Sequence, residues 1–358
     1  MWFDSCVDGH DLERILGDLP EPDGFTAILG GAAALGTHIG LVRDCNEDRS
    51  GVLLLAEGNR HLLGAVVCDG IGGLPHGDVA AVVALSAFAT HFAALTARRH
   101  PPPLERRAEQ AVLAANQAVN AHLGGTSGCT LSAILADATH VVLCHVGDSV
   151  IFSVTNGLAK RLTRRHTIQG ELQRLAGDPT RVANRRDELV NYVGMADPPE
   201  VDTTSLALHD RPSRFVLMTD GAVSDAATLE PLLSHAPSCS DLTRRALALS
   251  KWVGGQDNAS VIAVDLPKAL HRIPKHLAPL LQTPTTRMAV HPAILSDVDE
   301  ASTPAQSKPK GEPRAGKKRG GRKQGSSKTQ SEPESPDRTP PEPPEIEYFD
   351  DSKGKVHQ

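Results

Sequence analysis

Short apolar runs and longer helical patterns alternate between residues 26 and 266. The short runs are rich in Val, Leu, Ile and Ala and are bounded by glycine and polar turn residues, which is typical of β-strands. Strands are expected at residues 52–55, 62–68, 129–136, 140–146, 150–154, 214–219 and 259–266. The connections among the third, fourth and fifth of these are short, including the turn Gly147-Asp148-Ser149. They predict antiparallel pairing, because a parallel crossover needs roughly a dozen residues or more.

Helical patterns occupy two blocks of the same region. Helices are expected at residues 79–99, 104–123, 228–235 and 240–253. The first ends before a run of three prolines and the second stops at Gly124-Gly125, both of which end helices. Residues 160–200 are polar, arginine-rich and irregular. Many antiparallel strands with two blocks of helices predict an α+β fold in which helices cover sheets.

The pattern also predicts how the chain is organised. A polar lead-in, a folded domain, a weakly structured connector and a tail are expected at residues 1–25, 26–266, 267–300 and 301–358, respectively. The tail holds a block rich in Lys, Arg and Gly, followed by an acidic, proline-rich block. Neither block carries enough apolar surface to offset the entropy of ordering, so we expect the tail to be disordered.

Composition narrows the class of protein. Apolar residues make up 40% of the 358 residues, enough for a sizeable core, and the net charge of −6 argues against a nucleic-acid binder that is basic throughout. The six cysteines form no CxxC pair, which favours a reducing, cytoplasmic compartment. We see neither a signal peptide nor an apolar run of the roughly 18 residues that a transmembrane segment needs.

Four aspartates follow or precede apolar runs that lie far apart in the sequence: Asp69, Asp148, Asp220 and Asp257. A carboxylate at the end of a buried strand is costly unless a cation neutralises it. Taken singly, each is also a common turn residue, and Gly-Asp-Ser at Asp148 is an ordinary hairpin turn. The set as a whole favours a metal site.

The donors point to a hard metal. Glu47 and Asp48 add two carboxylates, and Mg²⁺ and Mn²⁺ prefer such oxygen ligands. The 16 histidines are scattered and form no zinc motif. Two ions about 3.5–4 Å apart would share Asp69, with the carbonyl of Gly70 as a further ligand, and would activate a water for attack on a phosphate ester. Arg43 is placed to bind the phosphate, although a surface ion pair with Asp44 or Asp48 is the alternative.

Seven motifs resemble those of the metal-dependent protein phosphatases of the 2C type, in the same order and at similar spacing over residues 26–266. They are RDCNEDR, VCDGIGG, GCTLSAIL, HVGDS, LTRRHT, LMTDGAVSD and QDNASVIAV. The resemblance implies an αββα sandwich of two antiparallel sheets flanked by helices. It also implies a serine/threonine protein phosphatase that uses two Mn²⁺ or Mg²⁺ ions on phosphorylated protein substrates, the targets of a cognate kinase.

The resemblance implies a role for each site residue. Asp69 would bridge both ions, Gly70 would offer its carbonyl to one, and Asp220 and Asp257 would complete the other. Glu47 and Asp48 would bind directly or through water, and Asp148 would hold a weaker third ion. Arg43 would bind the substrate phosphate.

The chain departs from the family pattern in two places. Ile71 stands where many members have a histidine general acid, which indicates a bacterial-type site, and His76 is the nearest titratable alternative. Arg165 replaces the acid of the LTxDH motif and is expected to alter the flap that receives substrate.

Three alternatives bear on function. Cys239 and Arg245 match the C-x5-R pattern of cysteine phosphatases but lack the glycine-rich loop which that chemistry needs. A non-catalytic phosphoprotein-binding or scaffold module on the same fold is a second alternative. The charged tail is either a solvated linker or a recruitment element for an acidic partner, nucleic acid or a membrane surface.

Overall fold

The computed structural model of this chain describes eight stretches of sequence. They are residues 6–7, 23–57, 60–176, 188–208, 213–222, 226–274, 280–282 and 287–290. The expected tail, residues 301–358, and most of the expected lead-in lie outside them. The described elements all belong to one compact unit, Met1–Thr303.

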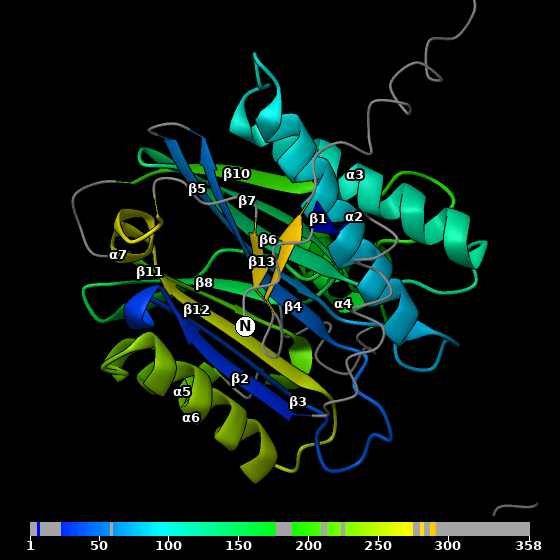
Figure 1. The fold of residues 1–358 in the computed structure, drawn as a ribbon. Helices are drawn as coiled ribbons and strands as arrows, with labels where there is room; N and C mark the ends of the chain where they lie inside the picture. Colours follow the sequence, from blue (N-terminus) through cyan, green and yellow to red (C-terminus); the bar gives the residue numbers. More distant parts are fainter. Residues whose placement is uncertain are drawn as a thin grey trace, which may run out of the picture. The chain divides into compact units, whose positions relative to one another are not determined.

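Two β-sheets form the centre of this unit (Figure 1). The larger has eight strands in the order β1 (Cys6–Val7), β14 (Arg287–Val290), β13 (Leu280–Gln282), β4 (Arg49–Glu57), β5 (Arg60–Cys68), β6 (Leu131–Ala136), β7 (His140–Val146) and β10 (Asp202–Ala207). The smaller has six strands in the order β2 (Asp23–Ile28), β3 (Ala33–His38), β12 (Ala259–Asp265), β11 (Ser213–Met218), β8 (Val150–Thr155) and β9 (Leu158–Arg161). Neighbouring strands are antiparallel except for β1 and β14.

Helices cover the outer faces of both sheets, and apolar side chains fill the three interfaces. α2 (Gly77–Ala97) and α3 (Leu104–Leu123) pack on the eight-stranded sheet, and α5 (Ala226–His235) and α6 (Cys239–Trp252) pack on the six-stranded sheet. A third cluster, with Leu63, Ile134 and Ile262, lies between the sheets. The expected αββα sandwich is therefore confirmed.

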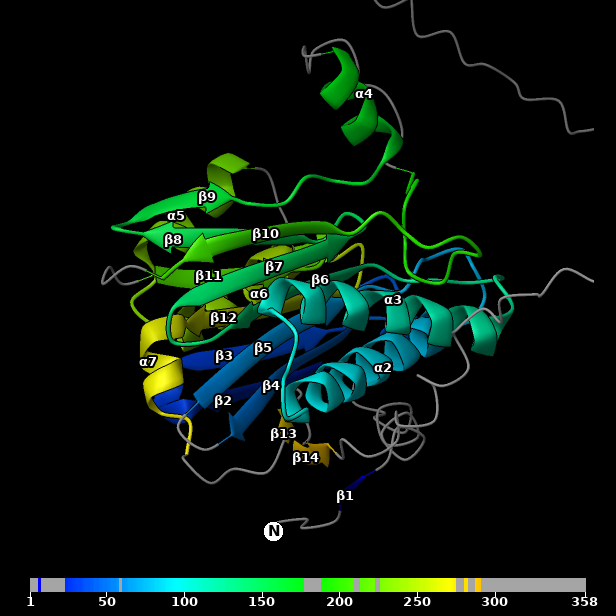
Figure 2. The same ribbon diagram turned by 90° about the horizontal axis from the view of Figure 1, so that it is seen from above.

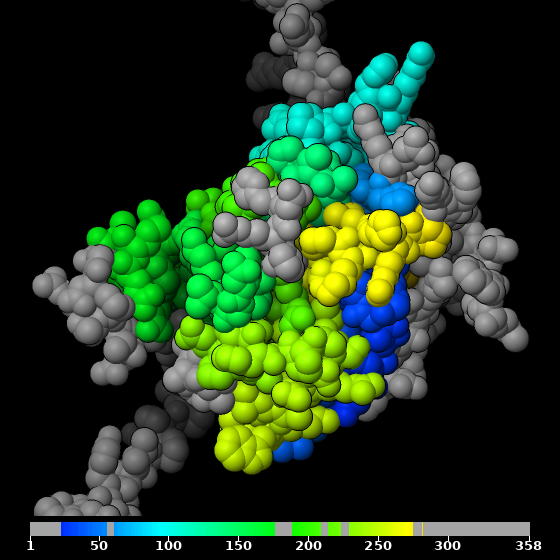
Figure 3. Space-filling view, turned by 90° about the vertical axis from the view of Figure 1, so that its left-hand side faces the viewer, coloured from blue at the N-terminus to red at the C-terminus, as the bar shows by residue number. Residues whose placement is uncertain are grey.

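Two further helices lie outside these layers. α7 (Leu266–His271), yellow in Figure 3, packs across one end of both sheets and touches β5, β11 and β12. α4 (Ile168–Ala176) projects away from the sheets (Figure 2). α7 begins directly after the last residue of β12 and therefore lies at the end of the sheets where β12 ends. Loops connect the strands at the opposite end.

α2 is the one described helix long and apolar enough to cross a membrane, which the sequence pattern did not lead us to expect. Its apolar surface has partners within the protein, since 78% of the apolar window is buried. Phe88 and Phe92 are fully buried and stack 6.3 Å apart in the cluster formed with β4, β5 and α3. Helices that are apolar all round belong in the centre of a domain, and α2 is such a core helix.

The structure differs from the sequence expectation at the turn Gly147-Asp148-Ser149. β7 and β8 do not pair: β7 lies in the eight-stranded sheet and β8 in the six-stranded one. Stacked sheets are about 10 Å apart, a gap that three residues can span. The short connection therefore marks a crossing between sheets rather than a hairpin.

Several elements also lie where the sequence predicts none. β9 and α4 fall in or next to the segment expected to be irregular, and β10 has the polar sequence DTTSLA. α7, β13 and β14 lie within the expected connector, residues 267–300. This segment therefore contributes a helix and two strands to the same compact unit.

Candidate metal centre

The strand ends opposite α7 surround a pocket of about 490 Å³. Asp69 follows β5 and Asp148 follows β7 of the larger sheet, whereas Asp220 follows β11 and Asp257 precedes β12 of the smaller sheet. All four line the pocket, together with Gly70 and Arg43. The structure thus brings together four aspartates that the sequence separates, because each lies at the same end of the sandwich.

Burial strongly perturbs three carboxylates at this end. It raises the pKa of Asp48 to about 7, helped by the charges of Asp220 and Asp257 and opposed by a hydrogen bond from Thr219 Oγ1 to Asp48 Oδ2 (2.8 Å). Burial and the neighbouring Asp48 and Asp220 raise the pKa of Asp69 well above its usual value. Burial and Asp257 raise that of Asp220, although its hydrogen bond with Asp69 opposes the rise. Ionising all three carboxyl groups together is unfavourable in free energy unless positive charge is added.

Arg43 supplies part of that charge. Its Nη2 donates to Asp257 Oδ2 at 2.8 Å, and this hydrogen bond is the main reason why the pKa of Arg43 is raised. Both side chains are 35% exposed, so water screens the pair. The sequence offered Asp44 or Asp48 as ion-pair partners of Arg43, and the structure shows Asp257 instead.

Glu47 and Asp48 lie beside the pocket rather than in its lining. Glu47 packs against two glycines: a Cβ on Gly77 would lie 2.9 Å from Glu47 Oε1, and one on Gly70 would lie 2.9 Å from Glu47 Cβ. Asp48 is buried, and its Oδ1 has no hydrogen-bond partner among the described residues. A buried carboxylate oxygen without a partner is the kind of atom that a cation would satisfy.

The donor set fits a hard cation in its chemistry. Every candidate is a carboxylate or a backbone carbonyl, as Mg²⁺ and Mn²⁺ require. As the side chains are placed, no three His, Cys, Asp or Glu of the described residues converge closely enough to hold one ion. Two contacts explain this: Asp257 is hydrogen-bonded to Arg43, and Asp69 and Asp220 share a hydrogen bond.

Two polar residues that the sequence did not single out position these carboxylates. Thr130 Oγ1 accepts from the backbone N of Asp69 (3.1 Å) and is hydrogen-bonded to Ser149 Oγ (2.8 Å). Asn258 accepts from the backbone N of Glu47 and donates to the carbonyls of Ile39 and Cys45, all at 2.8–2.9 Å. The sequence signal that could have identified Thr130 and Asn258 is their position within the motifs GCTLS and QDNAS, respectively.

The two departures from the family pattern have structural consequences. Ile71 lines the pocket with a side chain that has no proton to donate. His76 precedes α2 in a left-handed conformation (φ +65°), is exposed and does not line this pocket. Arg165 lies in the segment that leads to α4, and its charge lowers the pKa of Asp220. Arg165 therefore influences the acidic site, and its expected effect on a flap that receives substrate stays a prediction.

Arg164 fixes the segment that leads to α4 to the rest of the fold. Its guanidinium donates to Asp202 at 2.7 and 3.1 Å, to Glu200 at 3.1 Å and to Glu171 at the start of α4. Asp202 also contacts buried His166 at 3.0 Å. The segment that leads to α4 thus rests on a charged network beside β7 and β10.

Cys239 does not behave as a nucleophile. It is buried at the start of α6, and burial raises the pKa of its thiol. A reactive cysteine needs the opposite shift, so the structure agrees with setting the C-x5-R match aside.

Comparison with known proteins identifies the family. Residues 42–253 match the family described as Protein phosphatase 2C. The serine/threonine phosphatase stp of Listeria innocua is 26% identical over 240 residues, which cover 64% of this chain and 93% of that protein. The crystal structure of the Mycobacterium tuberculosis serine/threonine phosphatase PstP/Ppp superposes with a TM-score of 0.56 at 25% identity, covering 65% of this chain and 97% of that one.

The layered fold, the acidic pocket and these matches agree on a class of phosphatase. This chain belongs to the protein phosphatase 2C family. The resemblance seen in the seven sequence motifs is confirmed.

Proposed function

We propose that this chain is a metal-dependent serine/threonine protein phosphatase that hydrolyses phosphoserine and phosphothreonine in proteins. One observation carries the proposal. Carboxylates from the strand ends of both sheets face one pocket, with Arg43 in its wall. The names of relatives support it, since both the Listeria and the Mycobacterium proteins are serine/threonine phosphatases. No feature of the described site favours the scaffold alternative.

The carboxylates are proposed as the ligands of two Mn²⁺ or Mg²⁺ ions. Asp69 would be shared by both ions, the carbonyl of Gly70 would serve one, and Asp220 and Asp257 would complete the other. Glu47 and Asp48 would bind directly or through water. A solved PstP catalytic domain of this fold, at 24% identity and a TM-score of 0.54, is in complex with two manganese ions. Bound ions supply a water that is nucleophilic at neutral pH and screen the charge of the phosphate. Asp148, which is buried at the pocket wall, is proposed as the ligand of a third ion.

The protein's own groups position the substrate. Arg43 would exchange Asp257 for the phosphate of the substrate, for which its planar guanidinium is suited. Thr130 holds the backbone of Asp69 in place from the neighbouring strand. Ile71 covers part of the pocket without donating a proton, so we propose that water protonates the leaving group.

The cellular setting is also a proposal. Five of the six cysteines are free, which suits a cytoplasmic protein: Cys45, Cys68, Cys129, Cys144 and Cys239. A cognate serine/threonine kinase would supply the substrates. The catalytic domain at residues 26–266 would act with the tail at residues 301–358 as a recruitment element.

Phosphate release from matched peptides tests the function. We expect Mn²⁺-dependent turnover of phosphoserine and phosphothreonine peptides and none with Asp69→Asn. Absence of turnover at every metal concentration, together with tight binding of the same peptides, would favour the scaffold alternative. Equal turnover of a phosphotyrosine peptide would contradict the proposed specificity.

A further inference from the structure

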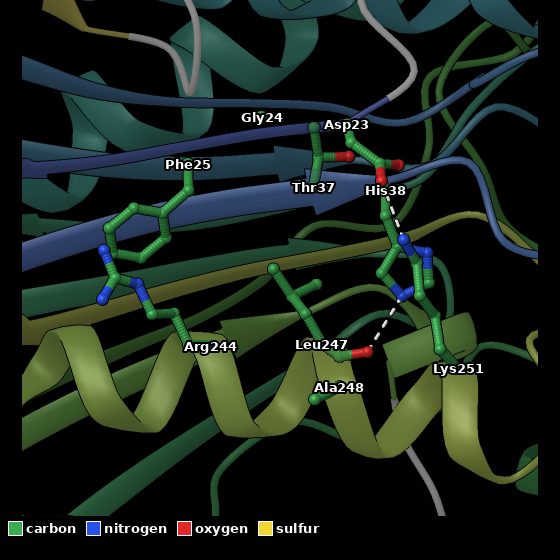
Figure 4. A pocket seen from close by; sticks show the side chains of 9 residues that line it. All are labelled: Asp23, Gly24, Phe25, Thr37, His38, Arg244, Leu247, Ala248 and Lys251. Atoms are coloured by element: carbon green, nitrogen blue, oxygen red, sulfur yellow. Dashed lines mark hydrogen bonds and ion pairs between the residues drawn. The ribbon is translucent and has the colours of Figure 1, made fainter.

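A second hollow lies between the edge of the six-stranded sheet and helix α6 (Figure 4). It has a volume of about 430 Å³, and we call it the β2–α6 pocket. Its walls include Asp23, Phe25, His38, Arg244, Leu247 and Lys251. None of these residues takes part in the proposed metal centre.

The two ends of this pocket differ in charge. At one end, the guanidinium of Arg244 lies over the ring of Phe25, 4.2 Å from its centroid. Within the described residues no carboxylate forms an ion pair with Arg244, which is exposed on α6. At the other end, Lys251 Nζ donates to Asp23 Oδ2 at 2.7 Å. The stacked arginine is therefore a pre-positioned cation that has no anionic partner there.

Between the two ends the pocket is apolar and open to a sheet edge. Half-buried Leu247 lies between the Phe25 side and the His38 side (Figure 4). β2 is the last strand of its sheet, pairs only with β3 among the described strands, and has no buried residue. An open strand edge offers backbone donors and acceptors to an added strand.

Both walls of the pocket lead into the catalytic loops. β3 ends at His38, whose Nδ1 accepts from the backbone N of Gly40 at 2.9 Å, a few residues before Arg43. α6 ends at Trp252, and the loop beyond it runs to Asp257 while Gly255 O accepts from Leu41 N at 2.7 Å. A segment bound along β2 is thus held by the same elements that carry the catalytic loops.

We propose that the β2–α6 pocket docks an extended acidic segment of the phosphoprotein substrate, at a distance from the phosphorylated residue. The backbone of the segment pairs along β2, an apolar side chain covers Leu247, and a carboxylate meets Arg244. This inference rests on the proposed phosphatase function. Docking raises the effective concentration of the phosphorylated residue at the catalytic pocket, so it lowers KM and leaves kcat unchanged.

Direct binding tests the chemistry of the pocket. The probe is a fluorescent, non-phosphorylated peptide of alternating Glu and Leu, titrated against the full-length chain at low salt. We expect Arg244→Glu to weaken binding at least about tenfold. Arg245→Glu is the matched control, because it makes the same charge change on an exposed residue of α6 that does not line the pocket. Equal losses in both variants, or no loss in Arg244→Glu, would overturn the proposal.

Kinetics test whether the occupant is the substrate. Two phosphoserine peptides are compared, one with and one without an acidic extension. The extension should lower KM in the wild type and in Arg245→Glu but not in Arg244→Glu. If neither peptide is hydrolysed, the proposed function fails. The binding experiment still tests whether the β2–α6 pocket binds an acidic segment. If both are hydrolysed with the same KM although the probe binds through Arg244, the assignment to substrate is overturned.

Discussion

At the scale of single residues, the protein is organised around carboxylates that cannot ionise together. Asp48 is buried, Asp69 and Asp220 are half-buried beside it, and loss of solvation is the main reason that the pKa of each is raised. Arg43, Arg49 and Arg165 bring positive charge to the group. The proposed ions would supply the remainder and would displace protons as they bind.

These shifts predict how the stability of the metal-free protein depends on pH. A carboxyl group whose pKa is raised on folding stabilises the protein below its unfolded pKa, near 3.9, and that contribution is lost as pH rises through the folded value. For Asp48 the loss should run from about pH 4 to above pH 7. Chemical denaturation across this range should show that the free energy of unfolding falls as pH rises. The fall should be less steep in Asp48→Asn. An unchanged slope in Asp48→Asn would contradict the burial of its charge.

The ion pair of Arg43 with Asp257 predicts that loss of Arg43 weakens phosphopeptide binding but not Mn²⁺ binding. Arg43→Ala should raise KM for a phosphopeptide by roughly 10- to 100-fold, because it removes the phosphate ligand. It should not weaken Mn²⁺ binding, since Asp257 is released from its partner. Arg106→Ala, on the exposed side of α3, is the control. Weaker Mn²⁺ binding in Arg43→Ala would mean that the arginine supports the metal site instead.

At the scale of elements, the turn between β7 and β8 ties the two sheets to the acidic pocket. Gly147 has φ +109°, and a Cβ there would lie 2.6 Å from the Cβ of Thr130. Thr130 in turn holds Asp69. A side chain at Gly147 would therefore press on the residue that positions the central carboxylate.

This contact predicts the effect of a small substitution. Gly147→Ala should weaken Mn²⁺ binding and lower phosphate release, in addition to a backbone cost of about 1–2 kcal/mol for the left-handed conformation. Gly157→Ala is a matched control, because Gly157 also has positive φ (+74°) but no atom closer than 4.0 Å to its Cβ. It should lose stability without losing Mn²⁺ affinity. Equal Mn²⁺ affinity in the two variants would contradict the role of the turn.

Elements with a strong apolar pattern were predictable from sequence, and others were not. The helix over residues 104–123 and the strand over 140–146 have the expected bounds, because apolar periodicity and glycine or proline stops mark them. β10 was missed because it is a polar edge strand held by its pairing with β7. The hairpin expected across Gly147-Asp148-Ser149 was wrong, because a short connection does not reveal which sheet receives the next strand.

The sequence predicted which acidic residues lie at the site but not which residues contact one another. Motifs located the aspartates because each follows or precedes a strongly apolar strand. The partner of Arg43 was not predictable, since Asp257 is 214 residues away in sequence. Asn258 and Thr130 were missed for the same reason: their hydrogen bonds join segments that only the fold brings together.

At the scale of the whole molecule, the sequence predicts separate tasks for the folded domain and the tail. Deletion of residues 301–358 should leave the turnover of short phosphopeptides unchanged, because the proposed catalytic residues all precede residue 266. It should alter which proteins are captured with the phosphatase. Affinity capture with both forms checks this, and identical capture would rule out recruitment by the tail.

The central claim is that carboxylates from both sheets form one metal centre. Calorimetric titration of Mn²⁺ into the full-length protein at neutral pH tests it directly. We predict two tight sites in the wild type and in the control Asp197→Asn, whose carboxylate is exposed and outside the pocket. Asp69→Asn should lose tight binding. Two tight sites retained in Asp69→Asn would contradict the claim.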